Sequence, residues 1–329
     1  MKKVPISFRI DDPAPVYSTF YTHRANHLTD YGEPILEKFP NSFLFDFCDM
    51  IERNGMKGKF SIVPMVANQG DIINGLGDAP REEIDEWLDT VKKRVAPRFT
   101  ICPEMLTHSM AIDIKTGKML DENENQWSQH QSRETLTPYI AKTLSFLKEA
   151  GFEVFGVTSP RRFGFDVRDE YAISISDAVY EVCGKENAWF TLGGLPMPAD
   201  AKAWVELEKD GRCLVSIPST TKERTWKILT DGDMSEEAIL KCADAYITED
   251  GKDGDIIRVL ENGGWPIMIS HWQSMYTNGS SAGLRAIDIV GQRIKKNLSD
   301  RVEWMSFEEI MNMVIADKES YPKPMVFND

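Results

Sequence analysis

The sequence lacks the features that mark membrane, secreted and disulfide-rich proteins. No apolar run approaches the roughly 20 residues that a membrane-spanning helix needs. The basic residues at the start are not followed by the apolar stretch of a signal peptide. The five cysteines are odd in number, widely spaced and without a C-x-x-C pair, so we interpret them as small buried residues in a reducing compartment. We therefore expect a cytoplasmic protein.

Positive charge is also in short supply. The 329 residues include 38 Lys and Arg against 52 Asp and Glu, which gives a formal net charge of −14. This balance argues against nucleic acid or an anionic membrane surface as a partner. Hydrophobic residues make up 42% of the chain and can bury a large core. No linker, repeat or low-complexity segment divides the sequence, so we expect a single domain over residues 1–329.

Short apolar segments alternate along the chain with segments of helical periodicity. The predicted strands include residues 4–10, 58–65, 98–105 and 152–160, and the predicted helices include residues 81–95, 135–151, 174–184, 283–298 and 306–318. This alternation predicts an α/β fold with a parallel sheet, either open or closed into a barrel. In such folds the catalytic groups lie where the strands end, at their carboxyl edge.

Polar residues follow several of these strands. Asp11 and Asp12 end the first strand, His108 follows the third, residues 160–162 follow the fourth, and His271 ends a late strand. We expect these four features to share one rim of the sheet. A carboxylate and a neutral imidazole that converge there suit a divalent ion such as Zn²⁺. Asp12 would then face the ion, and Asp11 would remain free to take a proton from water held by the ion.

Other residues near these strand ends have a structural and a functional interpretation. His271 is a candidate general acid, and the adjacent Trp272 and Tyr276 could stack on a sugar or pack in the core. Either Arg161 or the neighbouring Arg162 could orient a carboxylate, or the two could form a solvated pair. An i, i+4 pair of histidines, His23 and His27, could bind a metal from one helix face or lie on a surface helix.

At these residues the chain resembles the polysaccharide deacetylase family, carbohydrate esterases that include chitin and peptidoglycan deacetylases. FRIDDP is similar to the family's T-F-D-D-G motif, with Pro13 in place of glycine, and EMLTHSMAI is similar to E-I-G-x-H-[ST]-x-x-H. SPRRFG loosely resembles an Arg/Pro/Gly motif, and IMISHW resembles L-L-H-D. The resemblance spans most of the chain, with inserts at about residues 13–40 and 113–134 on the active-site side.

The resemblance implies a distorted parallel (β/α)7-type barrel and a set of roles for the rim residues. Asp11 would be the general base, Asp12 and His108 would bind the metal, and His271 would be the acid, with Arg161 as a further catalytic residue. The second histidine of the family's metal motif falls on Ile112 in this chain.

A third metal ligand must therefore come from elsewhere. We favour Asp113, one position after the missing histidine; the alternatives are His23, His27 and His130 from the inserts, or the absence of a metal.

The resemblance implies a metal-dependent hydrolase that removes an acyl group, through a C–N or ester bond, from a carbohydrate or an N-acyl small molecule. The cofactor would be a divalent metal, Zn²⁺ or else Co²⁺, Ni²⁺ or Mn²⁺. Trp272 and Tyr276 would contact the substrate. The alternative is a carbohydrate-binding or scaffold protein that keeps the fold but does not catalyse a reaction.

Overall fold

The predicted alternation of strands and helices is present in the computed structural model, which describes residues 3–17, 38–193 and 197–324. The parallel strands are β1 (Val4–Asp11), β2 (Gly58–Ile62), β5 (Phe99–Pro103), β8 (Gly156–Thr158), β9 (Asn187–Thr191), β11 (Arg212–Ser216), β12 (Ile267–His271) and β13 (Val302–Trp304). The antiparallel strands are β3 (Gly70–Asp71), β4 (Gly75–Leu76), β6 (Met110–Ile112), β7 (Met119–Asn123) and β10 (Trp204–Lys209).

The helices lie between and after these strands. They are α2 (Asn41–Asn54), α3 (Arg81–Thr90), α4 (Glu124–Ser128), α5 (Arg133–Glu149), α6 (Arg168–Cys183), α7 (Thr225–Asp231), α8 (Glu236–Tyr246), α9 (Asp255–Glu261), α10 (Trp272–Tyr276), α11 (Ala282–Asn297) and α12 (Phe307–Ala316). A π-helical turn, Val91–Val95, extends α3, and 3₁₀ turns occupy Val66–Asn68 and Lys318–Ser320. None of the helices in these residues is both long and apolar enough to cross a membrane.

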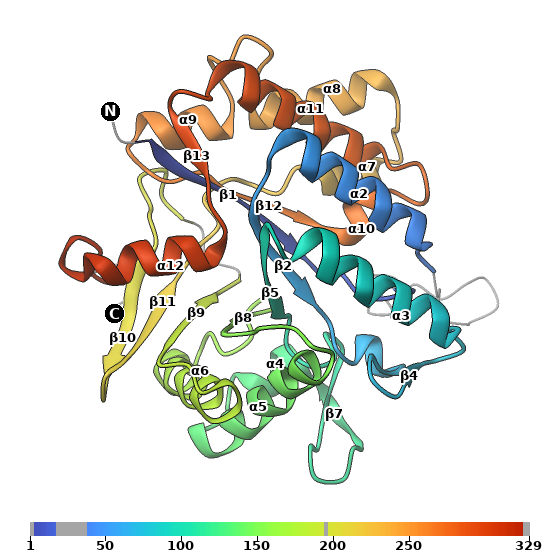
Figure 1. Ribbon diagram of the computed structural model, residues 1–329, viewed down its shortest axis with the longest axis vertical. Helices are drawn as coiled ribbons and strands as arrows, with labels where there is room; N and C mark the ends of the chain where they lie inside the picture. The colour runs from blue at the N-terminus through green and yellow to red at the C-terminus, as the bar shows by residue number, and fades with distance from the viewer. Residues whose placement is uncertain (1–2, 18–37, 194–196, 325–329) are drawn as a thin grey trace.

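The parallel strands form two sheets, which confirms the mixed α/β class. One sheet has the order β12-β1-β2-β5, with β13 beside the start of β1, and the other has the order β10-β11-β9-β8 (Figure 1). Strand β5 at the edge of the first sheet lies beside β8 of the second. At the other edge, Thr220 donates its backbone N–H to the carbonyl of Ile267 at 3.1 Å. The closed (β/α)7-type barrel stays a prediction, because the strand ladders of the described residues end at these two seams.

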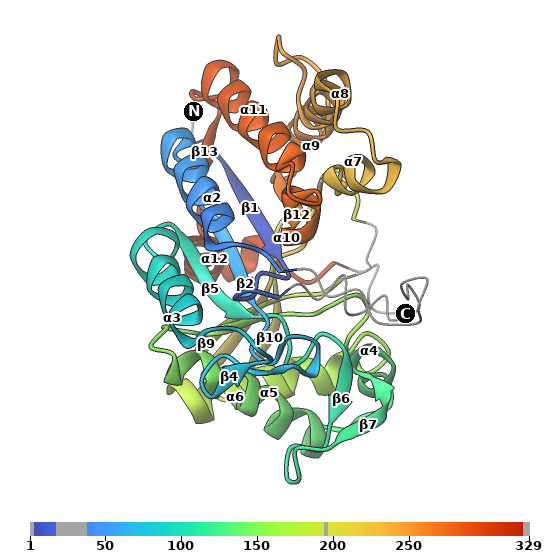
Figure 2. The same cartoon turned by 90° about the vertical axis from the view of Figure 1, so that its right-hand side faces the viewer.

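Helices cover the sheets on several sides. In both views α8, α9 and α11 lie together on one side of the strands, and α5 and α6 lie on the opposite side (Figures 1 and 2). Helix α2 turns an apolar face to the first sheet, where the ring of Phe47 lies 5.7 Å from that of Phe60. The helix ends before Gly55, which adopts the left-handed conformation (φ 66°) that commonly closes helices.

Candidate functional site

Asp11 and Asp12 separate at the end of β1. Residue Asp11 is the last residue of the strand, and Asp12 has φ 69°, in the left-handed region that aspartate tolerates better than most residues. The strand alternation therefore places Asp11 on the same face as Arg9. The backbone turn directs Asp12 to a different set of neighbours, on the loop that follows β5.

Asp12, Glu104 and His108 form a buried group in which the potential metal-ligand atoms all lie within 4.8 Å of one another. His108 Nε2 lies 3.0 Å from Asp12 Oδ1 and 3.7 Å from Glu104 Oε1. The backbone N–H of Asp12 donates to Glu104 Oε2 at 2.7 Å, so Glu104 also fixes the turn that carries Asp12. Among the described residues this is the one group of three or more His, Cys, Asp or Glu side chains with such spacing.

The loop that carries His108 is held in an unusual shape by Glu124. Met105 and His108 both have positive φ values, 45° and 51°. The buried carboxylate of Glu124, at the start of α4, accepts the backbone N–H groups of Leu106 (3.1 Å), Thr107 (2.8 Å) and His108 (2.7 Å). These bonds to a charged acceptor offset the conformational cost of the loop.

Replacing Glu124 with glutamine is expected to lower divalent-metal affinity by about 10-fold or more, the range for residues that orient metal ligands. The amide NH₂ would face a backbone N–H donor, so the His108 loop would lose one of its three backbone bonds. Titration of the metal against a competing chelator measures the effect. A matched control is Tyr139→Phe, which removes only the phenolic hydroxyl that donates to Glu124 at 2.6 Å. Equal metal affinity in Glu124→Gln and the parent would contradict this role.

The group retains protons when no cation is bound. Burial, together with the charges of Asp11 and Asp12, raises the pKa of Glu104 to about 8. Burial acts to lower the pKa of His108, but the carboxylates of Asp12 and Glu104 outweigh it and raise that pKa to about 9. A divalent ion would displace these protons on binding. Two carboxylates and an imidazole are a suitable donor set for such an ion, so the residues present fit a metal.

Asp11 lies in a different setting, between two buried cations. Arg9 Nε donates to Asp11 Oδ1 at 2.8 Å, and Lys59 Nζ also donates to this carboxylate. All three side chains are at least 95% buried. Burial alone would raise the pKa of Asp11, but Arg9 and Lys59 hold it below the usual range of aspartate. Asp11 is therefore ionised and already engaged by donors.

The two cations also join the sheets. Arg9 Nη1 donates to Thr191 Oγ1 of β9 at 2.6 Å, and Lys59 Nζ donates to Thr158 Oγ1 of β8 at 2.8 Å. Because Arg9 and Lys59 belong to β1 and β2, these bonds cross from the first sheet to the second. The space between the sheets near Asp11 is thus a hydrogen-bonded polar network, as buried charges require.

His271 lies next to Asp11 across the sheet. It is the last residue of β12 and the direct register partner of Asp11 in the β1–β12 ladder. The structure thus brings Asp11, Asp12, His108 and His271 to the carboxyl ends of neighbouring strands, the edge on which the sequence places them.

Two aromatic residues proposed to contact substrate lie in packing positions. Trp272 is only 1% exposed and packs against Phe43 and Phe47, with ring centroids 4.6 Å and 5.4 Å away. Tyr276 is half-buried, and its ring lies 4.2 Å from that of Phe39. Trp272 therefore packs in the core, which is the structural alternative to a role in substrate binding.

Other sequence candidates lie outside the Asp12–Glu104–His108 group. Asp113 accepts the backbone N–H of Lys115 at 2.8 Å in the turn between β6 and β7, so its carboxylate closes a hairpin. The exposed His130 lies 3.3 Å from Glu122. His23 and His27 fall outside the described residues.

The two arginines after β8 are both exposed. Arg162 pairs with Asp166 at 3.0 Å and covers the ring of Phe165, whereas Arg161 is exposed with φ 48°. The structure therefore does not bring either guanidinium into the buried group.

Sequence reasoning missed Glu104, Glu124, Arg9 and Lys59 as members of the site. A signal existed for three of them. Glu104 precedes His108 by four residues, and Arg9 and Lys59 each interrupt an otherwise apolar predicted strand. A charged residue inside such a strand is rarely buried without a partner. No pattern of spacing distinguishes Glu124 from the other acidic residues of the 113–134 insert.

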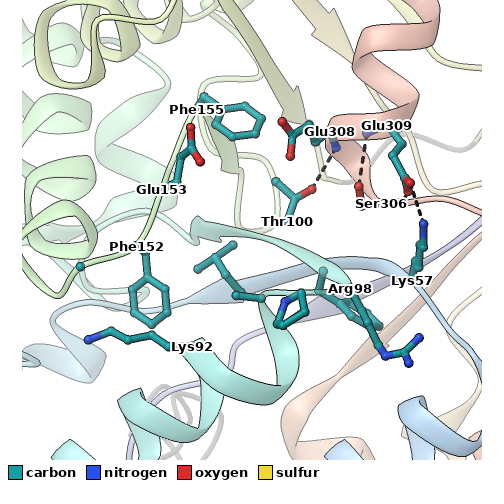
Figure 3. A pocket seen from close by; sticks show the side chains of 15 residues that line it. Lys57, Lys92, Arg98, Thr100, Phe152, Glu153, Phe155, Ser306, Glu308 and Glu309 are labelled. Carbon is teal, nitrogen blue, oxygen red and sulfur yellow. Dashed lines mark hydrogen bonds and ion pairs between the residues drawn. The ribbon is translucent and has the colours of Figure 1, made fainter.

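A surface hollow of about 470 Å³ lies at the opposite ends of the strands (Figure 3). Its lining includes Lys57 and Arg98, the residues that immediately precede β2 and β5. Lys57 pairs at 2.6 Å with Glu309, which also lines the hollow. None of the lining residues belongs to the Asp12–Glu104–His108 group, so this cavity is not the candidate site.

Comparison with known proteins gives a likeness at the level of the fold. A crystal structure described as "putative polysaccharide deacetylase from Mycobacterium smegmatis" matches the chain with a TM-score of 0.52 and 13% sequence identity, covering 98% of this chain and 93% of that one. No protein-family model and no curated protein matches the sequence. The likeness therefore shows a fold shared with that structure, and fold alone does not assign an activity.

Proposed function

We propose that the protein is a metal-dependent hydrolase of the polysaccharide deacetylase type, which removes an acyl group from a carbohydrate or a related small molecule. The observation that carries this proposal is the buried Asp12–Glu104–His108 group at the carboxyl ends of β1 and β5. Structural carboxylates are seldom gathered in the interior without a compensating cation.

In this proposal Asp12, Glu104 and His108 hold a divalent ion, and Glu104 takes the place for which the sequence suggested Asp113. An ion held there would supply Lewis-acid activation of the hydrolytic water and of the acyl oxygen. Carboxylates favour harder ions such as Mn²⁺ more than imidazole does. The replacement of a second histidine by Glu104 therefore makes Mn²⁺ and Co²⁺ candidates alongside Zn²⁺ and Ni²⁺.

The chain's own residues supply the other requirements of a hydrolase. Asp11 is the candidate base by position, and Arg9 and Lys59 fix its carboxylate. Its lowered pKa makes it a weak base, so it serves best by orienting water rather than by holding the proton. His271, across the sheet from Asp11, is the candidate hydrogen-bond donor to the substrate.

A second candidate function is a carbohydrate-binding protein without catalysis. It is favoured first by the engagement of Asp11 by two buried cations, which occupies the carboxylate that a hydrolase would use. It is favoured also by Ile112, which stands at the family's second histidine position. This side chain is 4% exposed and packs in the core.

Metal content together with hydrolysis tests the proposal. Protein purified without chelator is expected to hold about one equivalent of divalent metal and to release acetate from N- or O-acetylated sugars. The Asp12→Asn/His108→Gln double variant should lose both properties, whereas His130→Gln, a matched control with an exposed histidine, should keep them. Absence of bound metal, with no thermal stabilisation by any of Zn²⁺, Mn²⁺, Co²⁺ or Ni²⁺, would rule out a metal-dependent enzyme. Metal binding without acetate release would favour the non-catalytic alternative.

A further inference from the structure

The imidazole of His271 is held by a tryptophan. Trp226, in the first turn of α7, donates its indole N–H to His271 Nδ1 at 3.0 Å. The two rings are tilted by 50°, with their centroids 5.2 Å apart, so the contact is an edge hydrogen bond and not a stack. Both side chains are half-buried.

The hydrogen-bonding capacity of the Trp226 indole determines which nitrogen of the His271 ring carries the proton. An indole nitrogen can only donate a hydrogen bond, because its lone pair belongs to the aromatic system. His271 Nδ1 must therefore present a lone pair to Trp226, and the single proton of the neutral imidazole must reside on Nε2. A proton on Nδ1 would place two N–H donors against each other.

The position of Trp226 is fixed by several bonds of its own segment. Glu223 accepts the backbone N–H of Trp226 at 3.0 Å. The hydroxyl of Thr225 lies 2.7 Å from that of Ser270 in β12 and 2.7 Å from that of Ser274 in α10. The first turn of α7 is thus hydrogen-bonded to residues on both sides of His271. These bonds hold the indole of Trp226 in place against the imidazole.

We propose that Trp226 is a positioning residue that fixes His271 as the neutral Nε2–H tautomer. The ring then offers a hydrogen-bond donor at Nε2 and has no proton to offer at Nδ1. A catalytic role for this tautomer rests on the proposed function. In that role, the Nε2–H group would donate a hydrogen bond that stabilises charge developing on a substrate oxygen. It differs from an imidazole paired with a carboxylate, because a carboxylate at Nδ1 would favour a protonated ring.

Nitrogen NMR of the full-length protein tests the tautomer without any assay of activity. Long-range proton–nitrogen correlation spectra of ¹⁵N-labelled protein report which ring nitrogen of each histidine carries a proton. The chain has five histidines, and the His271→Gln variant identifies the signals of His271 by their loss. The parent is expected to show His271 with an unprotonated Nδ1 and a protonated Nε2. In Trp226→Phe, the same ring should become a mixture of the two tautomers.

A matched control removes a different buried indole donor. Trp204 donates to Glu206 at 2.7 Å, and Trp204→Phe should leave the His271 signals unchanged. A proton on Nδ1 of His271 in the parent, or an unchanged Nε2–H tautomer in folded Trp226→Phe, would overturn the proposal. If Trp226→Phe does not fold, the parent spectrum decides alone. An Nε2–H tautomer in a protein that hydrolyses no substrate would support this inference and count against the proposed function.

Discussion

Glutamine at position 104 is expected to lower the affinity of the protein for divalent metal by about 100-fold or more, beyond the effect of changing a residue that only orients a ligand. The substitution replaces one of the two carboxylates of the Asp12–Glu104–His108 group with a neutral amide. The amide oxygen can still accept the N–H of Asp12, so the local turn should persist. Competition titration with a chelator measures the loss, and circular dichroism confirms the fold.

Asp113→Asn is the matched control, because it removes the other carboxylate considered as a third ligand. Asp113 closes the β6–β7 turn by accepting the N–H of Lys115, and an asparagine oxygen can do the same. This variant should bind metal as the parent does. The reverse result, with metal lost in Asp113→Asn and retained in Glu104→Gln, would restore Asp113 as the ligand.

Asparagine at position 11 is expected to reduce the free energy of unfolding by about 3–5 kcal/mol, the usual cost of leaving a buried charge without its partner. Removing this carboxylate leaves Arg9 and Lys59 facing each other as direct register partners in adjacent strands. Urea denaturation of the metal-free protein measures the change. The control Asp89→Asn breaks an exposed pair with Lys93 and should cost less than about 0.5 kcal/mol. Similar losses in the two variants would refute the structural importance of the buried pair.

Because Asp11→Asn is expected to destabilise the protein, a loss of activity in this variant would not by itself show that Asp11 is a base. A double variant separates the two effects. Asp11→Asn/Lys59→Met removes one cation with the anion, so the remaining Arg9 no longer faces a second positive charge. We expect it to be more stable than Asp11→Asn alone. If this double variant is stable but inactive, Asp11 has a chemical role. If it recovers activity, Asp11 is a structural counter-ion only.

The fold could be predicted to the level of its strand and helix alternation because apolar periodicity is a local property. The segments around β1, β2, β5 and α11 are strongly patterned, and their boundaries are close to those predicted. Strand β10 was not predicted, because its charged residues Glu206, Glu208 and Lys209 resemble a loop. The contacts that bring the two sheets together, between β5 and β8 and between Thr220 and Ile267, join segments distant in the sequence, and no local pattern encodes them.

The candidate site could be predicted only in part. Asp12 and His108 are recognisable because each follows a patterned strand, and the structure brings them to 3.0 Å. The family's histidine spacing points to position 112 and not to Glu104, the carboxylate four residues before His108. Asp113 was favoured from its position in the sequence. In the structure Asp113 closes the hairpin turn between β6 and β7. The pairing of these two strands lies in a segment that has no clear strand pattern.

The order of the site residues along the chain has a consequence for biosynthesis. The proposed metal ligands and Glu124, which shapes their loop, all lie within the first 124 residues, and β1, β2 and β5 pair with one another in that region. His271 and Trp226 come from the last third of the chain. Because chains emerge from the ribosome amino-terminus first, a nascent chain contains every proposed ligand well before β12 is made. Under the proposed function, binding of an ion and completion of the rim by His271 can therefore occur as separate events during synthesis.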